Sequence, residues 1–253
     1  MPRRIAALLL GLGLAWIFAG CAATNDENLR LPPVSIQTLQ YYPFQVKGYQ
    51  HSYPSARRIV VLTPADVRDF KQAGSAAHDP YQGHPAIGVI LNHQGRTIQQ
   101  LYGPELGPLF RDAIAQAAKE AGMVSSTSTA ALAQALEERS ADYVLQSKIT
   151  GLWVVKQRGA DQEGGPAWFT AAQVTLEVEI FKPPFAVPFW SGESDADYSD
   201  PPTPPANATP ADETEIYDLP GEVLSVAITR AVAGIFRQED LHTLVLQDAI
   251  APQ

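Results

Sequence analysis

Three histidines within a short stretch are the first candidates for chemistry. His78, His84 and His93 fall within 16 residues, and Asp79 follows the first of them. Imidazole nitrogens and carboxylate oxygens are ligands that catalytic zinc takes in hydrolases. Such ligands need rigid elements to fix them, but separations of six and nine residues fit neither a helix nor a tight turn. We therefore expect loop histidines at the surface, no metal and no cofactor, with a metal-dependent hydrolase as the least favoured alternative.

Glu177 and Glu179 are the second candidates, because they lie two residues apart in a run that alternates between polar and apolar residues. The alternation predicts a strand, on which both carboxylates point the same way about 7 Å apart. Paired carboxylates at such separations can do acid–base work. However, the polar face of an antiparallel strand is commonly just solvated, and the sequence contains no glycine-rich phosphate loop, dinucleotide fingerprint or nucleophile elbow. We predict no catalytic residues.

The single cysteine, Cys21, ends a segment that has the features of a secretory signal. Arg3 and Arg4 precede an apolar run of 14 residues from Ile5 to Phe18, and small residues lead from there to the cysteine. The run is too short to cross a bilayer as a helix, which takes about 20 residues. A charged start, a short apolar middle and a small-residue cleavage site predict a signal peptide. An ordinary signal with a chance cysteine is the alternative.

The residues Phe18-Ala-Gly-Cys21 resemble the lipobox of bacterial lipoproteins. The resemblance implies that the Cys21 thiol carries diacylglycerol, that the signal is cut just before it, and that the new amino terminus is acylated. Phe18 departs from the leucine more often found there. Ala22 follows in place of the aspartate that retains lipoproteins in the inner membrane of enteric-type bacteria. The resemblance thus implies an anchor at the periplasmic face of the outer membrane, with the inner membrane as the alternative.

The charge composition argues against one class of partner. The chain has 253 residues, with 18 Lys+Arg against 27 Asp+Glu and a net charge of -9. Nucleic-acid binding leaves a basic footprint, so we expect no nucleic-acid partner. Residues 183–229 contain nine acids and no Lys or Arg, which equals the whole acidic excess. Nine prolines between Pro183 and Pro220 disfavour regular structure, so we predict an acidic, proline-rich loop at about 194–220.

Hydrophobic periodicity predicts the remaining elements. Asn92 to Gly95 is typical of a hairpin turn between two short strands. Pro104 and Gly122 are a start and a stop for an amphipathic helix, and Ser128 is the expected cap of a second helix. Another helix follows Asp218 as cap, with Pro220 in its first turn. The expected strands are residues 58–63, 87–91, 97–102, 143–155, 174–180 and 190–193, and residues 241–246 form a last strand or a helical tail.

These elements predict an α+β fold, in which two or three amphipathic helices pack on one face of a mostly antiparallel sheet. Residues 1–20 are the expected lipoprotein signal peptide, and residues 21–57 the lipidated N-terminus and tether. Residues 58–250 form the expected single periplasmic domain.

Two groups of aromatic residues are candidates for contact with a partner or a membrane. Phe185, Phe189 and Trp190 belong to an apolar, proline-rich strip, and Tyr41 and Tyr42 belong to the tether. Exposed apolar strips mark interaction sites. Packing against the protein's own core is the alternative, and the general preference of aromatic residues for cores favours it.

The order of elements over residues 58–193, together with the helix at 222–237, resembles YajG-like periplasmic lipoproteins. The likeness rests on Ile87-Gly88, Ala141–Leu145 and Trp190–Glu193. It implies an anchored, non-enzymatic envelope component, and we expect a binding or scaffolding role in envelope maintenance or assembly, with an envelope protein or a second copy as partner. The alternative is an accessory lipoprotein of an ABC-type lipid or solute transport or export system, whose apolar strip meets the cargo or the pore.

Overall fold

The computed structural model describes residues 52–54, 57–68, 84–138, 141–160, 166–200 and 215–250. The predicted signal peptide, Cys21, Tyr41 and Tyr42 lie outside these residues. Within the described part, no helix is both long enough and apolar enough to cross a membrane.

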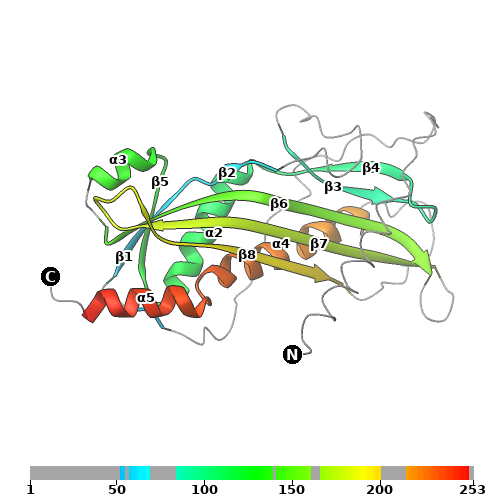
Figure 1. Ribbon diagram of the computed structural model, residues 1–253. Helices are drawn as coiled ribbons and strands as arrows, with labels where there is room; N and C mark the ends of the chain where they lie inside the picture. The colour runs from blue at the N-terminus through cyan, green and yellow to red at the C-terminus, as the bar shows by residue number, and fades with distance from the viewer. Residues whose placement is uncertain are drawn as a thin grey trace.

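One curled sheet organises the fold, and the long strand β6 is its centre (Figure 1). β6 pairs along its whole length with β7, which pairs in turn with β8. Its other edge is shared, because β1 and β2 pair with its first half and β3 with its second half. β5 extends the sheet beyond β1, and β4 extends it beyond β3. The strands are β1 (Arg58–Leu62), β2 (Ala65–Asp66), β3 (Ala86–Leu91), β4 (Thr97–Tyr102), β5 (Val124–Ser128), β6 (Tyr143–Ala160), β7 (Pro166–Phe181) and β8 (Pro188–Ser199).

The α+β class is confirmed, but the prediction of a mostly antiparallel sheet is wrong, because the sheet is mixed. Four strand pairs are parallel, namely β1 with β5, and β6 with β1, β2 and β3. Three are antiparallel, namely β3 with β4, β6 with β7, and β7 with β8. Hairpins can be recognised from local sequence, whereas parallel pairs form between segments separated by a crossover. The polar strand β5, Val-Ser-Ser-Thr-Ser, carries no apolar alternation that would have predicted it.

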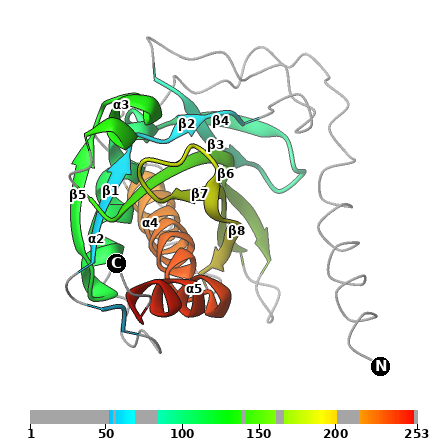
Figure 2. The ribbon, with the colours of Figure 1, turned by 60° about the vertical axis from the view of Figure 1, so that its left-hand side comes forward.

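The described helices divide between the two faces of the sheet. Three lie on one face, within the two or three predicted there, and one short helix lies on the other. α2 (Leu106–Glu120), α4 (Glu215–Ile235) and α5 (Glu239–Ile250) contribute to the main core on the inner face, and the sheet curls around α4 (Figure 2). α3 (Leu132–Glu137) packs instead with Val144 and Phe181 in a separate small cluster. Val144 alternates with the core residues Tyr143 and Leu145 along β6, so its side chain points to the opposite face.

Several local predictions are confirmed. β3 and β4 form a hairpin in which the Asn92 Oδ1 accepts hydrogen bonds from the amides of Gln94 and Arg96, and Gly95 has φ 75°. α2 buries Phe110 and Ile114 and ends before Gly122, whose φ of 101° suits glycine. Turn and cap signals of this kind act locally, which is why the sequence alone reveals them.

The acidic segment is more regular than predicted. β8 continues to Ser199, so the acids Glu193, Asp195 and Asp197 lie exposed on a strand rather than in a loop. Alternation explains this, because the residues between them face the core and the prolines resume only at Pro201. α4 starts at Glu215 and contains Pro220, rather than starting after an Asp218 cap. The central part of the predicted loop, 201–214, lies outside the described residues.

Two further boundaries differ from the prediction. Ser128 ends β5 instead of capping a helix, and α3 is a single short element with Ala131 at its N-cap. The tail after Leu241 is helical, since α5 covers it and buries Leu241 and Val245. Of the two alternatives for residues 241–246, a strand or a helical tail, the helix is therefore the correct one.

Arg68 joins the two halves of the sheet where β6 changes neighbours. Its side chain is 3% exposed and forms a bidentate ion pair with Asp66, at 2.7 Å from Nε to Oδ1 and 2.8 Å from Nη2 to Oδ2. Its Nη1 donates to the carbonyls of Ala86 on β3 and Leu152 on β6. The guanidinium therefore ties β2, β3 and β6 together, and its buried charge depends on the Asp66 carboxylate.

Replacing Asp66 by alanine is expected to lower the free energy of unfolding by about 3 kcal/mol, because it leaves the buried Arg68 charge uncompensated. Asp112→Ala is the matched control, since Asp112 pairs with Arg111 but its side chain is 65% exposed. Exposed pairs of that kind contribute less than about 1 kcal/mol. Urea unfolding of both variants measures the difference, and equal losses would contradict this role of Arg68.

Candidate binding surface

The histidines predicted as loop residues form no metal site within the described part of the chain. His84 is half-buried just before β3, His93 is exposed in the β3–β4 turn, and His78 lies outside the described residues. Among the described residues, no group of three His, Cys, Asp or Glu side chains is placed to hold a metal ion.

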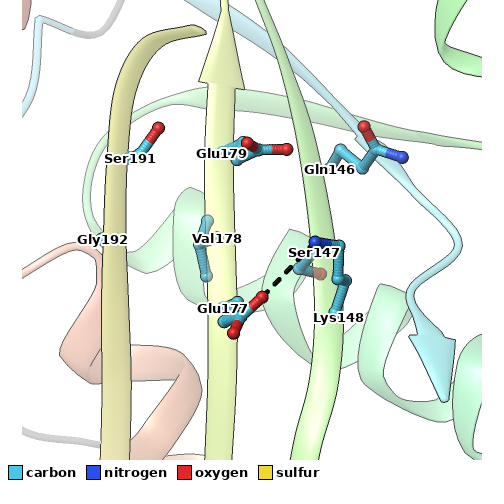
Figure 3. Close-up of a pocket in the computed structure, with 8 residues that line it drawn as sticks. All are labelled: Gln146, Ser147, Lys148, Glu177, Val178, Glu179, Ser191 and Gly192. Carbon is cyan, nitrogen blue, oxygen red and sulfur yellow. Dashed lines mark hydrogen bonds and ion pairs between the residues drawn. The ribbon is translucent and has the colours of Figure 1, made fainter. Parts of the chain in front are cut away.

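Glu177 and Glu179 lie on the outer face of the sheet, where the alternation placed them. They line a shallow hollow of about 160 Å³ together with Gln146, Lys148 and Ser191 (Figure 3). The Lys148 Nζ lies 3.4 Å from Glu177 Oε2, and both side chains of this pair are about half exposed. A solvated ion pair of this kind contributes little to the free energy of unfolding. The hollow is thus a polar, open part of the outer face.

The turn between β7 and β8, residues 182–187, is the most unusual part of the described surface. Phe185 is 64% exposed and Val187 is 75% exposed. Ile250, at the end of α5, is 82% exposed, and Asp248, two residues earlier, contacts Lys182 at the start of the turn. We call Phe185, Val187 and Ile250 the turn surface. Exposed apolar side chains on a turn and on the helix end that contacts it are candidates for an interaction site.

Buried aromatic residues hold the two strands that carry the turn. Phe181, the last residue of β7, packs in the small cluster beneath α3. On β8, Phe189 is half-buried with its ring 5.6 Å from that of Tyr143. Trp190 is only 5% exposed, and its Nε1 donates to Asp240 Oδ2 at 3.0 Å. Trp190 therefore belongs to the core rather than to a contact surface, because it is buried in the main core and its indole is bonded to Asp240 of α5.

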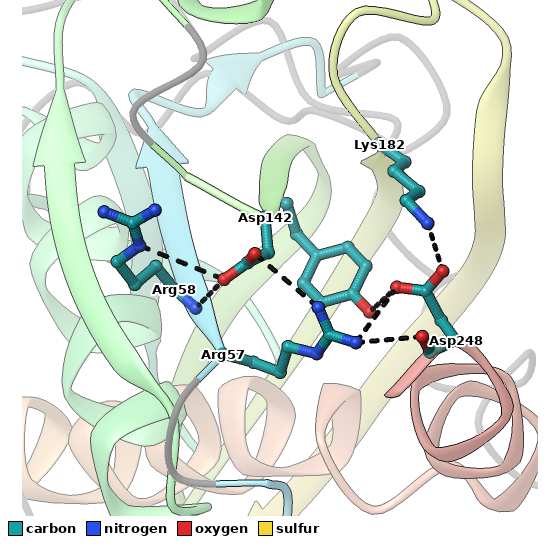
Figure 4. A network of polar contacts seen from close by, with 6 residues as sticks. Arg57, Arg58, Asp142, Lys182 and Asp248 are labelled. Carbon is teal, nitrogen blue, oxygen red and sulfur yellow. Dashed lines mark hydrogen bonds and ion pairs between the residues drawn. The ribbon is translucent and has the colours of Figure 1, made fainter. Parts of the chain in front are cut away.

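A polar network connects the turn to α5 and to the start of β1 (Figure 4). Asp248 is its centre: its side chain is 9% exposed and accepts hydrogen bonds from Lys182 and from the Tyr143 hydroxyl, the latter at 2.8 Å. The Arg57 Nη2 donates to the Asp248 carbonyl at 2.9 Å, and its Nη1 lies 3.6 Å from Asp142 Oδ1. The network fixes the turn to two other elements and so limits its freedom.

The network also changes the protonation of its members. Burial tends to raise the pKa of Asp248, but the hydrogen bonds from Lys182 and Tyr143 and the charges of Lys182 and Arg57 hold that pKa below its ordinary value. Burial, followed by the hydrogen bond to Asp248, raises the pKa of Tyr143 well above its usual range. At neutral pH the site thus contains an ionised carboxylate and a neutral phenol.

Asp248→Asn is expected to lower the free energy of unfolding by about 2 kcal/mol at pH 7, because hydrogen bonds to a buried charge are lost. The native state depresses the pKa of Asp248, so the contribution is complete above the ordinary carboxyl pKa and disappears as the pH falls through the lower native value. The difference between wild type and variant should therefore shrink below about pH 4. Urea unfolding across pH measures it, and a pH-independent difference would contradict the assignment.

Sequence reasoning identified the strip but not its division into exposed and buried residues. Phe185 and Phe189 were candidates, and the structure exposes the first and half-buries the second. Ile250 and the Asp248 network were missed, because residues 182 and 248 are brought together only by the packing of α5. Lys182, the one cation in the apolar strip, was the available signal, because lysine side chains are seldom buried unless they are paired.

Comparison with known proteins leaves the family open. No protein-family model matches the sequence, and no curated protein matches it. Among solved structures, a DUF330 protein from Xanthomonas campestris is similar at 12% identity and a TM-score of 0.43, covering 79% of this chain and 92% of that one. A putative neuraminyllactose-binding hemagglutinin homolog from Helicobacter pylori gives 10% identity and a TM-score of 0.43, with 83% and 100% covered.

The lipoprotein GNA1162 from Neisseria meningitidis is also similar, at 12% identity and a TM-score of 0.27, with 68% of this chain and 95% of that one covered. TM-scores below 0.5 identify neither a family nor a function. The resemblance to YajG-like lipoproteins and the lipobox therefore stay predictions from the sequence.

Proposed function

We propose that the protein is a membrane-anchored, non-enzymatic binding component of the bacterial cell envelope. Lipid on Cys21 holds it at the periplasmic face of the outer membrane, and it engages its target through the turn surface. The role is envelope maintenance or assembly, and no nucleic acid, metal or cofactor takes part.

The observation that carries the proposal is the exposure of Phe185 and Val187 on a turn whose first residue, Lys182, contacts Asp248 of α5. Exposing two large apolar side chains opposes the general tendency to bury such surface, and Lys182 at the start of the turn is paired with Asp248 of α5. A surface ordered before binding loses less conformational entropy when its target arrives. The lipid anchor adds to this by confining the protein near its target, which raises the effective concentration.

Site-specific photo-crosslinking in intact cells tests the proposal. A benzophenone amino acid is placed at Ala186, which is exposed between the two apolar residues, and the matched control is placed at Gln173, which is exposed on β7 away from the turn. We expect an adduct, with a protein or with lipid, from position 186 and none from position 173. Equal yields from both positions, or no adduct from position 186, would argue against the turn as the binding surface.

A further inference from the structure

Exposed apolar side chains occur on the β7–β8 turn and at the end of α5 that contacts it through Lys182 and Asp248. In the described part of the chain, six large hydrophobic residues are exposed, and Phe185, Val187 and Ile250 are three of them. The other three are Val67, which follows β2, Val124 at the start of β5, whose amide donates to the Arg57 carbonyl, and Phe169 on β7. Isolated exposed apolar residues are normal on protein surfaces, whereas neighbouring ones indicate an interaction site.

The chain from Cys21 joins the fold at this same end. Tyr53 packs edge-on against Phe236 and against His242 of α5. Four residues later, the Arg57 guanidinium donates to the carbonyl of Asp248, whose carboxylate also accepts from Lys182 of the turn. The first described residues of the chain therefore lie beside the network that supports the turn. Only 30 residues, 22–51, separate them from Cys21, so a bilayer that holds the lipid is within reach of this end.

We infer that the target of the turn surface is the lipid bilayer that holds the anchor, with Phe185 and Val187 inserted at its interface. The inference rests on the proposed function, since it names the ligand of the same surface. Aromatic and aliphatic side chains at the tip of a fixed turn reach the boundary between headgroups and acyl chains, about 5–10 Å deep.

The test uses the full-length lipidated protein in vesicles of phosphatidylethanolamine and phosphatidylglycerol. Cys21 is the only cysteine of the chain and is blocked by lipid, so a cysteine introduced by A186C takes an environment-sensitive fluorophore at one position. Q173C, labelled in the same way, is the matched control. Lipids with a spin label near the headgroup serve as quenchers.

We expect quenching at position 186 to lower its fluorescence about twofold or more, with a shift of emission to the blue, while position 173 is unaffected. Adding Phe185→Asp and Val187→Asp to A186C should abolish both changes. These side chains are exposed, so the substitutions leave the core untouched. Quenching at neither position, or at position 173 alone, would overturn the inference.

Failure of the inference is distinguishable from failure of the proposed function. If position 186 is not quenched but its benzophenone captures a protein or a second copy of this chain in cells, the bilayer is the wrong target and the turn remains the binding surface. If position 186 is neither quenched nor crosslinked, both the inference and the proposed function are wrong.

Discussion

Removal of the Cys21 thiol is expected to release the protein from the membrane fraction almost completely. Each buried methylene of an acyl chain contributes about 0.8 kcal/mol to membrane binding, so two or three chains hold the protein far more firmly than the turn surface does. Without lipid, two apolar side chains at an interface give weak and reversible association. We therefore expect the membrane-bound fraction to fall more than about tenfold.

The variant must be designed so that an uncleaved signal does not replace the lipid. Cys21→Ser alone leaves the apolar run of Ile5 to Phe18 attached if processing depends on the cysteine. The informative comparison replaces residues 1–21 by a cleavable secretory signal that lacks cysteine. Fractionation of cell envelopes with salt and carbonate washes measures the release, and a variant that stays in the pellet after both washes would show that Cys21 is not the anchor.

Replacement of Phe185 and Val187 by aspartate is expected to remove the turn-dependent adduct. Full burial of an apolar side chain of this size is worth about 1.5–3 kcal/mol. Loss of both contributions therefore corresponds to a reduction of about 100-fold or more in affinity. The benzophenone at Ala186 reads out the loss, because that position is unchanged in the double variant.

Phe169→Asp is the matched control for this variant. Phe169 is the same residue type as Phe185, but it lies on β7 at the end opposite the turn and is 36% exposed. Its substitution should leave the adduct yield unchanged. Thermal unfolding of both variants shows that the fold is retained, and an equal loss of adduct in the control would mean that added negative charge, rather than the turn surface, is responsible.

The sequence was sufficient where the signals are local. The β3–β4 hairpin follows from Asn92 to Gly95, and the end of α2 follows from Gly122, because both glycines adopt positive φ values that other residues avoid. The alternation around Glu177 correctly placed both carboxylates on the outer face. Each of these features depends on residues only a few positions apart.

The sequence was insufficient where distant segments meet. The parallel neighbours of β6 are set by crossovers, and the side chain of Arg68 fills the place where those neighbours change. The candidate site depends on the same kind of contact, since Lys182 and Asp248 are 66 positions apart. Which aromatic residues of the strip face solvent was decided by α5 and α3, whose packing buries Trp190 and Phe181 and leaves Phe185 exposed.

In the proposed function, the lipid anchor and the apolar turn act together. The most direct test is photo-crosslinking from Ala186 in intact cells, compared between the lipidated protein and the secreted variant without Cys21. We expect a strong adduct from the lipidated protein and a yield at least about tenfold lower from the unanchored one, because tethering raises the effective concentration of the target. Equal yields from the two proteins would contradict the proposed function.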